Sequence, residues 1–114
     1  MSVKMTTRQV GDVTVVDAVG RITLGDGAST FRDTIRDLSA GGKKKLLLNL
    51  AEVSYIDSSG IGEMVSSFTT VTNQGGQVKL LNLTKRVKDL LQITKLYTVF
   101  EVFEDEAAAV RSYS

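Results

Sequence analysis

The sequence contains no cysteine and no histidine, and these two absences exclude much of the chemistry that small proteins perform. Without cysteine there is no disulfide framework and no thiolate nucleophile. Zinc and copper bind mainly to imidazole and thiolate, so the chain has almost no means of holding either metal. Catalytic arrangements of the Ser-His-Asp and Cys-His types are excluded for the same reason. We therefore expect no metal site and no cofactor.

A strong net charge and long apolar runs are also missing. The 14 Lys and Arg residues nearly balance the 13 Asp and Glu residues, and a net charge of +1 creates no field that favours nucleic acid. No stretch approaches the roughly 20 apolar residues of a membrane span. The start, residues 1–9, lacks the apolar core of a signal peptide. We expect a single domain over residues 1–114, cytoplasmic, with no membrane span and no nucleic-acid partner.

Apolar periodicity predicts alternating strands and helices. Three consecutive leucines, Leu46 to Leu48, are flanked by charge and glycine, which is typical of a strand buried on both faces. Such burial requires layers above and below, so we expect an α/β fold in which about four helices flank a small mixed β-sheet with right-handed crossovers. The expected strands are 3–9, 13–19, 46–50, 78–83 and 99–103, and the expected helices are 28–40, 58–73, 85–93 and one that begins at 104–106, with a loop over 20–27.

The helix expected at 58–73 has the clearest amphipathic pattern. Its apolar residues recur at helical intervals, which places them on one face. We expect this face to lie in the core and the polar residues to point away from it, and we expect Thr84 to cap the following helix. The apolar stripe consists of Ile61, Met64, Val65, Phe68 and Val71, and the polar side chains away from it are Glu63, Ser66, Ser67, Thr70 and Asn73.

The most informative segment is VSYIDSSGIG, residues 53–62, which lies between the buried strand and this helix. Asp and Ser are the usual N-cap residues, so helix capping alone could account for the Asp-Ser-Ser run at 57–59. Two glycines in the first turn do not fit that interpretation, because each costs about 1 kcal/mol of helix stability relative to alanine. Bare backbone at Gly60 and Gly62 instead favours close approach by another molecule or by a phosphate.

A phosphate on a serine at this position would change binding without changing the fold. The N-terminus of a helix tolerates an anion, because the helix dipole is positive there. The phosphate would nevertheless add about 1.5–2 negative charges beside Asp57. An acidic group on a docked partner about 5 Å away would then be repelled by about 3 kcal/mol per charge pair at an effective dielectric near 20. That penalty weakens binding about a hundredfold.

Several short segments together carry a family resemblance. They are Leu48-Asn-Leu50, then Tyr55-Ile-Asp-Ser-Ser-Gly-Ile-Gly62 before a helix, then Gly75-Gly76, and a strand that ends in Leu-Asn-Leu. In this arrangement nearly the whole chain resembles the STAS domains of bacterial anti-sigma-factor antagonists. The resemblance implies that Ser58, directly after the aspartate, is phosphorylated by the anti-sigma factor, a serine kinase with a histidine-kinase-like ATPase fold. It also implies that a PP2C-type phosphatase reverses this step, and that the unphosphorylated form binds the anti-sigma factor and frees the sigma factor for transcription.

The resemblance also indicates which residues would contact the partner. The docking surface is expected at the start of the helix, and the loop after the second strand is expected to lie near the phosphoserine. Family members commonly carry Gly-Glu-Leu-Asp in that loop, whereas this chain has Gly20-Arg-Ile-Thr23, without either acidic residue. The expected partner-binding residues are Asp57, Ser58, Ser59, Gly60, Ile61, Gly62 and Thr23, with Ser58 as the phosphoacceptor.

The altered loop at residues 20–23 favours a second function, which we keep as an alternative to the first. It is that of a STAS scaffold or accessory subunit in a stress-signalling or lipid-transport complex, not controlled by phosphorylation. An enzyme is not expected, since without histidine a nucleophilic Ser58 would need Lys85 or Lys88 as its base. The Gly-Ile-Gly run at 60–62 lacks the third glycine of a dinucleotide site and the lysine of a P-loop, so we expect no nucleotide site there.

Two further patterns indicate structural roles. The lysines at 43–45, before the buried strand, are typical of solvated charges that discourage edge pairing. The apolar run from Leu96 to Phe100 is expected to pack against the rest of the chain, and any exposed part of it would be available to a partner.

Overall fold

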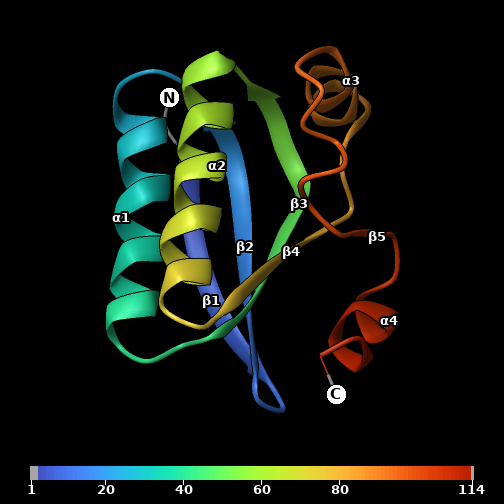
Figure 1. The fold of residues 1–114 in the computed structure, drawn as a ribbon. Coiled ribbons are helices and arrows are strands. Elements are labelled where there is room, and N and C mark those ends of the chain that lie inside the picture. Colours follow the sequence, from blue (N-terminus) through green and yellow to red (C-terminus); the bar gives the residue numbers. More distant parts are fainter. Residues whose placement is uncertain (1–2, 114) are drawn as a thin grey trace.

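Strands and helices alternate along the chain as expected, in a computed structural model that describes residues 3–113 (Figure 1). Residues 1–2 and 114, at the ends of the expected domain, lie outside the described residues. No helix in this part of the chain combines the length and the apolar character needed to cross a membrane. The strands are β1 (Val3–Val10), β2 (Val13–Ile22), β3 (Lys45–Ile56), β4 (Gln77–Leu81) and β5 (Val102–Phe103), and the helices are α1 (Asp26–Ala40), α2 (Ser58–Asn73), α3 (Lys85–Ile93) and α4 (Glu106–Arg111).

The strands form one mixed sheet in the order β1-β2-β3-β4-β5. The pair β1–β2 is antiparallel, and the other neighbouring pairs are parallel. Helices α1 and α2 lie side by side over one face of the sheet, and α3 stands beside the end of β3 (Figure 1). Helix α4 packs on the opposite face through Ala109. The expected α/β class, with a mixed sheet and flanking helices, is confirmed. The start of α2 lies at the end of the molecule where β3 ends.

Strand β3 is buried on both faces over its leucines, as predicted. Leu46 and Leu48 belong to the main core beneath α1 and α2. Leu47 points to the other face and packs in a second cluster that α4 closes. Full burial of one leucine side chain contributes about 1.5–3 kcal/mol, so these leucines anchor β3 firmly in the core. The second cluster comprises Val13, Val15, Leu47, Leu81, Ala109 and Tyr113.

Strand β3 is longer than expected. It runs to Ile56 instead of ending at Leu50, because β2 pairs with it as far as Ile56. Strand β4 pairs with it only as far as Asn49. Beyond that point β3 has an unpaired edge, and exposed residues such as Glu52 are compatible with a strand there. The polar character of this stretch hid the continuation of the strand.

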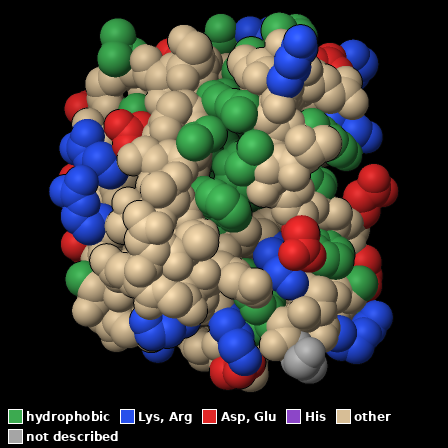
Figure 2. Space-filling model, in the orientation of Figure 1, with side chains coloured by type: hydrophobic (Ala, Val, Ile, Leu, Met, Phe, Trp, Pro, Cys, Tyr) green, Lys and Arg blue, Asp and Glu red, His purple; other side chains and the backbone are tan. Residues whose placement is uncertain are grey.

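The apolar run before β5 packs against α2 more than it pairs with the sheet. Phe100, expected in a strand, is buried, and its ring meets that of Phe68 edge to face with 5.3 Å between the centroids. Val99 is 38% exposed and lines a shallow groove with Phe68 and Val78. Figure 2 shows hydrophobic side chains gathered on the side of α2 that faces α3. The predicted packing is confirmed, and the predicted strand at 99–103 was too long, because only Val102–Phe103 pair with β4.

The lysines at 43–45 do not protect a sheet edge, and that prediction was wrong. They precede and begin β3, which is the central strand of the sheet. Lys45 instead forms an ion pair with Asp12 at 2.5 Å. Lys44 donates a hydrogen bond to the backbone carbonyl of Gln74 at 2.5 Å. These contacts join the turn after β1 and the end of α2 to the start of the central strand.

Close packing of α1 corrects two further expectations. Ser67 was expected on the polar side of α2, but it is buried because α1 packs along that side. Helix α1 begins at Asp26 instead of Ala28, and β2 continues to Ile22. The expected loop over 20–27 is therefore reduced to residues 23–25. This short connection leaves Thr23 little freedom and keeps it close to the end of β2.

Gly60 allows the first turn of α2 to pass directly against the end of β2. A Cβ atom at Gly60 would overlap the carbonyl oxygen of Ile22 and would lie 2.7 Å from Cγ1 of Ile56. Packing within the chain therefore explains this glycine, and approach by another molecule is not needed to explain it. At Gly62 a Cβ atom would meet nothing within 4 Å. The interpretation of bare backbone as a contact surface stays a prediction for Gly62 alone.

Replacing each of these glycines by alanine is expected to give opposite results. The substitution G60A should lower the free energy of unfolding by about 1–3 kcal/mol, the usual cost of overpacking, because the new methyl group must displace the backbone of Ile22. The substitution G62A should raise the free energy of unfolding by up to about 1 kcal/mol, since alanine is the better helix former. Urea unfolding followed by circular dichroism measures both. Equal effects of the two substitutions would contradict the packing role of Gly60.

Candidate functional site

Asp57 joins the end of β3 to the start of α2 and to the loop after β2. It is the N-cap of α2, and its Oδ1 accepts a hydrogen bond from the backbone N–H of Gly60 at 2.9 Å. Its Oδ2 accepts a hydrogen bond from the backbone N–H of Leu24 at 3.0 Å. The capping interpretation of the motif therefore applies to Asp57. The same carboxylate also holds the loop that contains Thr23 beside the helix.

The surroundings of Asp57 favour its ionised form. Partial desolvation opposes ionisation, but the backbone N–H groups of Leu24, Gly60 and Ser59 stabilise the carboxylate, and the pKa of Asp57 is lowered from its ordinary value. The positive end of the α2 dipole acts in the same direction. Asp57 is therefore a fixed negative charge at the start of α2 at neutral pH.

Ser58 is the first residue of α2, and its side chain is exposed. Because Asp57 supplies the cap, the helix does not depend on the Ser58 hydroxyl for this purpose. Ser58 borders a groove of about 420 Å³ that lies between the end of β3, the start of α2 and α3. Tyr55, Arg86 and Ile93 also line this groove. A group attached to the Ser58 hydroxyl would thus border this groove.

Most of the predicted site residues meet at this end of the molecule. Residues 57–59 follow one another at the start of α2, and Thr23 directly precedes Leu24, whose backbone N–H is bonded to Asp57. Gly62 is exposed one turn further along the helix. These residues can therefore belong to one continuous surface.

Two of the predicted partner-binding residues, Gly60 and Ile61, are buried. Gly60 packs against Ile22 at the end of β2. Ile61 is only 3% exposed and belongs to the main core, which confirms that it anchors the helix. Neither residue offers a side chain to a partner in this conformation. We therefore remove both from the docking surface.

Comparisons with known proteins identify the family of this fold and motif. The sequence model of the STAS domain matches residues 4–109. The chain belongs to the STAS domain family. One relative is the anti-sigma-B factor antagonist of Bacillus subtilis (strain 168), which is 32% identical over 102 residues, or 90% of this chain and 92% of the relative.

Solved structures share the fold of this STAS domain. An anti-sigma factor antagonist from Mycobacterium paratuberculosis gives a TM-score of 0.85 at 17% identity, over 97% of this chain and 93% of that one. The Bacillus protein SpoIIAA gives 0.75 in its phosphorylated form, at 18% identity and over 97% of this chain and 100% of that one. Its unphosphorylated form gives 0.71, at 19% identity and over 97% and 99% of the two chains. At these identities the likeness establishes the fold.

Sequence reasoning about the STAS domain missed an aromatic and cationic cluster beside Ser58. The guanidinium groups of Arg86 and Arg21 lie 4.2 and 4.9 Å from the ring centroid of Tyr55. A partial signal was present, since Arg21 and Tyr55 stand near the ends of neighbouring strands and are paired in register. No pattern in the sequence indicates that α3 brings Arg86 to the same ring.

Two exposed apolar side chains near the site were also missed. Leu24 is 80% exposed, and its backbone is held by Asp57. Ile93, at the end of α3, is 76% exposed and lines the groove beside Ser58. Each looked in the sequence like an ordinary member of an apolar pattern, and only the packing of the folded chain shows that both are left outside the core.

Removal of the Asp57 carboxylate is expected to weaken two segments at once. The substitution D57A should lower the free energy of unfolding by about 1–2 kcal/mol, as other lost N-caps do. It should also speed amide hydrogen exchange at Leu24. The matched control is D105A, which removes the cap of α4, where Asp105 accepts from the N–H of Ala108 at 2.9 Å. The rate of amide exchange at Leu24 should not change in D105A. An unchanged rate in D57A would contradict the role of Asp57 in holding the loop after β2.

The stabilisation by Asp57 is also expected to depend on pH. Because the pKa of Asp57 is lower in the folded chain, its contribution is complete above the ordinary value of 3.8 and is lost as the pH falls through the folded value. The difference in free energy of unfolding between wild type and D57N should be constant between about pH 7 and 5 and should shrink below about pH 4. Urea titrations across this range measure it. A difference that persists in acid would argue against a stabilising carboxylate.

Proposed function

We propose that this STAS domain is an anti-sigma-factor antagonist, a cytoplasmic binding protein that is switched by phosphorylation of Ser58. The observation that carries the proposal is the division of roles at the start of α2, where Asp57 caps the helix and the adjacent Ser58 is exposed. The relatives named as anti-sigma factor antagonists support it. In its unphosphorylated form the domain binds the anti-sigma factor, a serine kinase, and thereby frees the sigma factor for transcription.

The proposed modification places one phosphoryl group on Ser58. The kinase transfers the γ-phosphoryl group of ATP to Oγ of Ser58, whose proton is released, and a PP2C-type phosphatase hydrolyses the ester to serine and inorganic phosphate. The fold should tolerate the phosphate, because Asp57 retains the cap and the α2 dipole favours an anion. SpoIIAA supports this expectation, since both its forms share the fold of this domain.

Electrostatic repulsion is sufficient to release a partner from this surface. The phosphate adds about 1.5–2 negative charges beside the fixed charge of Asp57. An acidic group of the partner about 5 Å away would be repelled by about 3 kcal/mol per pair, or about a hundredfold in affinity. The exposed side chains of Leu24 and Ile93 supply the apolar area that a bound partner would cover.

The surroundings of Ser58 favour a binding protein over a serine hydrolase. A nucleophilic serine needs a base, and Lys85 donates a hydrogen bond to Asp89 at 2.8 Å that raises the pKa of Lys85. A lysine in this state holds its proton at neutral pH. Lys88, the other candidate base, lines a separate hollow with Asn82. We therefore assign Ser58 the role of a phosphoacceptor.

The exposed Arg21 favours a second candidate function. It occupies the position at which the resemblance predicts a glutamate, and it lies in β2 close to the site. A scaffold or accessory subunit of a stress-signalling or lipid-transport complex would bind its partner through the same end of the molecule, without phosphorylation. The two functions differ in whether charge at position 58 controls binding.

Substitutions that change the charge at residue 58 test the proposed switch. The S58A protein should bind the anti-sigma factor constitutively, and S58D should bind it about a hundredfold more weakly, because one added charge costs about 3 kcal/mol. The matched control is S66D, which places the same charge on another exposed serine of α2 and should bind like wild type. Affinity purification from the native host identifies the partner, and calorimetry with purified proteins gives the dissociation constants.

Each outcome assigns one of the two functions. Recovery of a small ATPase-type serine kinase by S58A but not by S58D supports the antagonist. If S58A and S58D recover the same scaffold or transporter subunits with equal affinity, the switch is wrong and the accessory-subunit function replaces it.

A further inference from the structure

Two guanidinium groups pack against the ring of Tyr55 at the edge of the groove beside Ser58. The Cζ atoms of Arg86 and Arg21 lie 4.2 and 4.9 Å from its ring centroid. A cation–π contact of this kind does not use up the N–H groups of a guanidinium group, which can still donate hydrogen bonds. Within residues 3–113 neither arginine forms an ion pair with an acidic side chain. Two exposed cations are thus held in place without a counter-ion.

The acidic side chains that line the groove are already engaged. Asp57 accepts hydrogen bonds from backbone N–H groups on two segments. Asp89 accepts a hydrogen bond from Nζ of Lys85 at 2.8 Å. Arg86 is therefore the one charged side chain among the described lining residues that has no charged or hydrogen-bonded partner of its own. The guanidinium group of Arg86 is therefore available to an anion that enters the groove.

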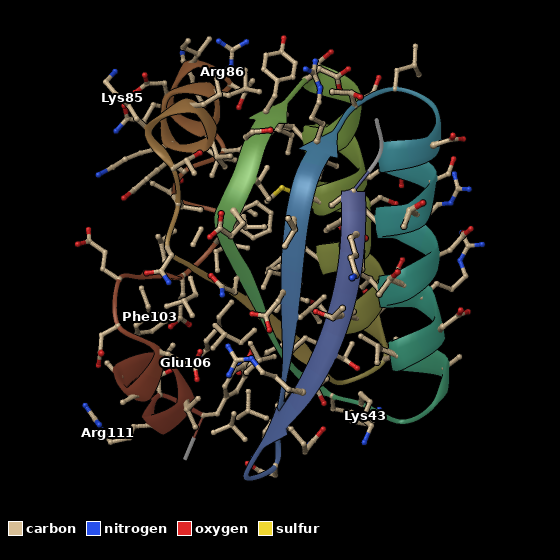
Figure 3. All side chains as sticks on the ribbon, turned by 180° about the vertical axis from the view of Figure 1, so that it is seen from behind. Lys43, Lys85, Arg86, Phe103, Glu106 and Arg111 are labelled. Carbon is tan, nitrogen blue, oxygen red and sulfur yellow. The ribbon has the colours of Figure 1, made fainter. Side chains whose placement is uncertain are left out.

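Arg86 and Ser58 line the same groove from different elements. Ser58 begins α2, and Arg86 lies in the first turn of α3. Figure 3 shows Arg86 at the end of the molecule where the arrowhead of β3 lies. The groove has a volume of about 420 Å³. A phosphate on Ser58 would therefore stand in a space that Arg86 also faces.

We infer that this groove is a phosphoryl-binding site in which Arg86, seated on Tyr55, donates hydrogen bonds to a phosphate carried by Ser58. The ligand is a phosphate monoester, whose oxygens match the paired N–H groups of a guanidinium. Arg21 adds a second positive charge on the same ring. The inference rests on the proposed phosphorylation of Ser58 and adds that the domain itself binds the phosphate.

The contact between Arg86 and the phosphate on Ser58, here called the clamp, gives the switch a second component. In the unphosphorylated domain Arg86 is available to an acidic group of the partner, whereas in the phosphorylated domain the phosphate engages it. Phosphorylation then occupies the guanidinium that would bind an acidic group of the partner and makes the net charge of the site more negative by about 1.5–2, so the affinity for the partner falls.

The clamp can be tested with the full chain alone, without a kinase or a partner. Phosphoserine is incorporated at position 58 during translation, and the phosphate is titrated by ³¹P NMR. Its second pKa is ordinarily about 6, and a guanidinium group that binds the dianion lowers it. The substitution R86Q should raise this pKa by about 0.5–1. The substitution R86K, which keeps the charge but loses the planar fork, should raise it less.

The comparison among variants isolates the effect of the clamp. Asp57 and Asp89 raise the pKa of the phosphate, while Lys85 and Arg21 lower it, and all four are present in every variant. The matched control is R36Q, which removes an exposed arginine on α1 and should leave the pKa unchanged.

An identical phosphate pKa in the unsubstituted, R86Q and R36Q proteins would overturn the inference, because the phosphate would then extend into solvent. That result would leave the proposed function intact, since repulsion alone can release a partner. Failure of S58A and S58D to differ in partner binding would conversely reject the switch, while the pKa comparison would still report whether the groove binds a phosphate.

Discussion

The contact between the first turn of α2 and the end of β2 determines the geometry of the whole site. Gly60 permits it, because any side chain at this position would overlap the carbonyl oxygen of Ile22. The carboxylate of Asp57 then fixes it by accepting hydrogen bonds from both sides of the contact. Strand β3 holds Asp57 in place through leucines that are buried on both faces of the sheet. The position of Ser58 is thus set by the core of the protein and not by a flexible loop.

This arrangement separates the helix cap from the proposed phosphorylation site. In many helices a serine at the start would itself be the cap, and a phosphate on it would compete with that role. Here Asp57 is the cap, and the pKa of its carboxyl group is lowered, so the helix start is complete before any modification. A phosphate on Ser58 would therefore cost little folding stability. The proposed switch could then alter partner binding through charge alone, without a conformational change.

Local patterns predicted what depends on local forces, and missed what depends on the meeting of distant segments. The bounds of α2 and α3 and the cap at Thr84 follow from apolar period and capping chemistry within a few residues. The burial of Gly60 depends on Ile22, which is far away in the sequence. Gly60 and Gly62 therefore looked alike in the sequence, although only Gly60 is enclosed in the structure. The cluster on Tyr55 needs three elements to meet, and no period within one of them records that meeting.

The sign of the charge at residue 21 affects the groove beside Ser58, and the sequence alone does not indicate this effect. Arg21 and Arg86 share the ring of Tyr55, so residue 21 acts on the groove through its neighbour. A glutamate there, as the family resemblance would predict, would attract the guanidinium of Arg86 instead of repelling it. An arginine cannot do so, and it keeps the guanidinium of Arg86 available. The two like charges repel each other weakly at this exposed position. An incoming anion relieves that repulsion, so the substitution that departs from the family pattern makes this end of the domain more receptive to negative charge.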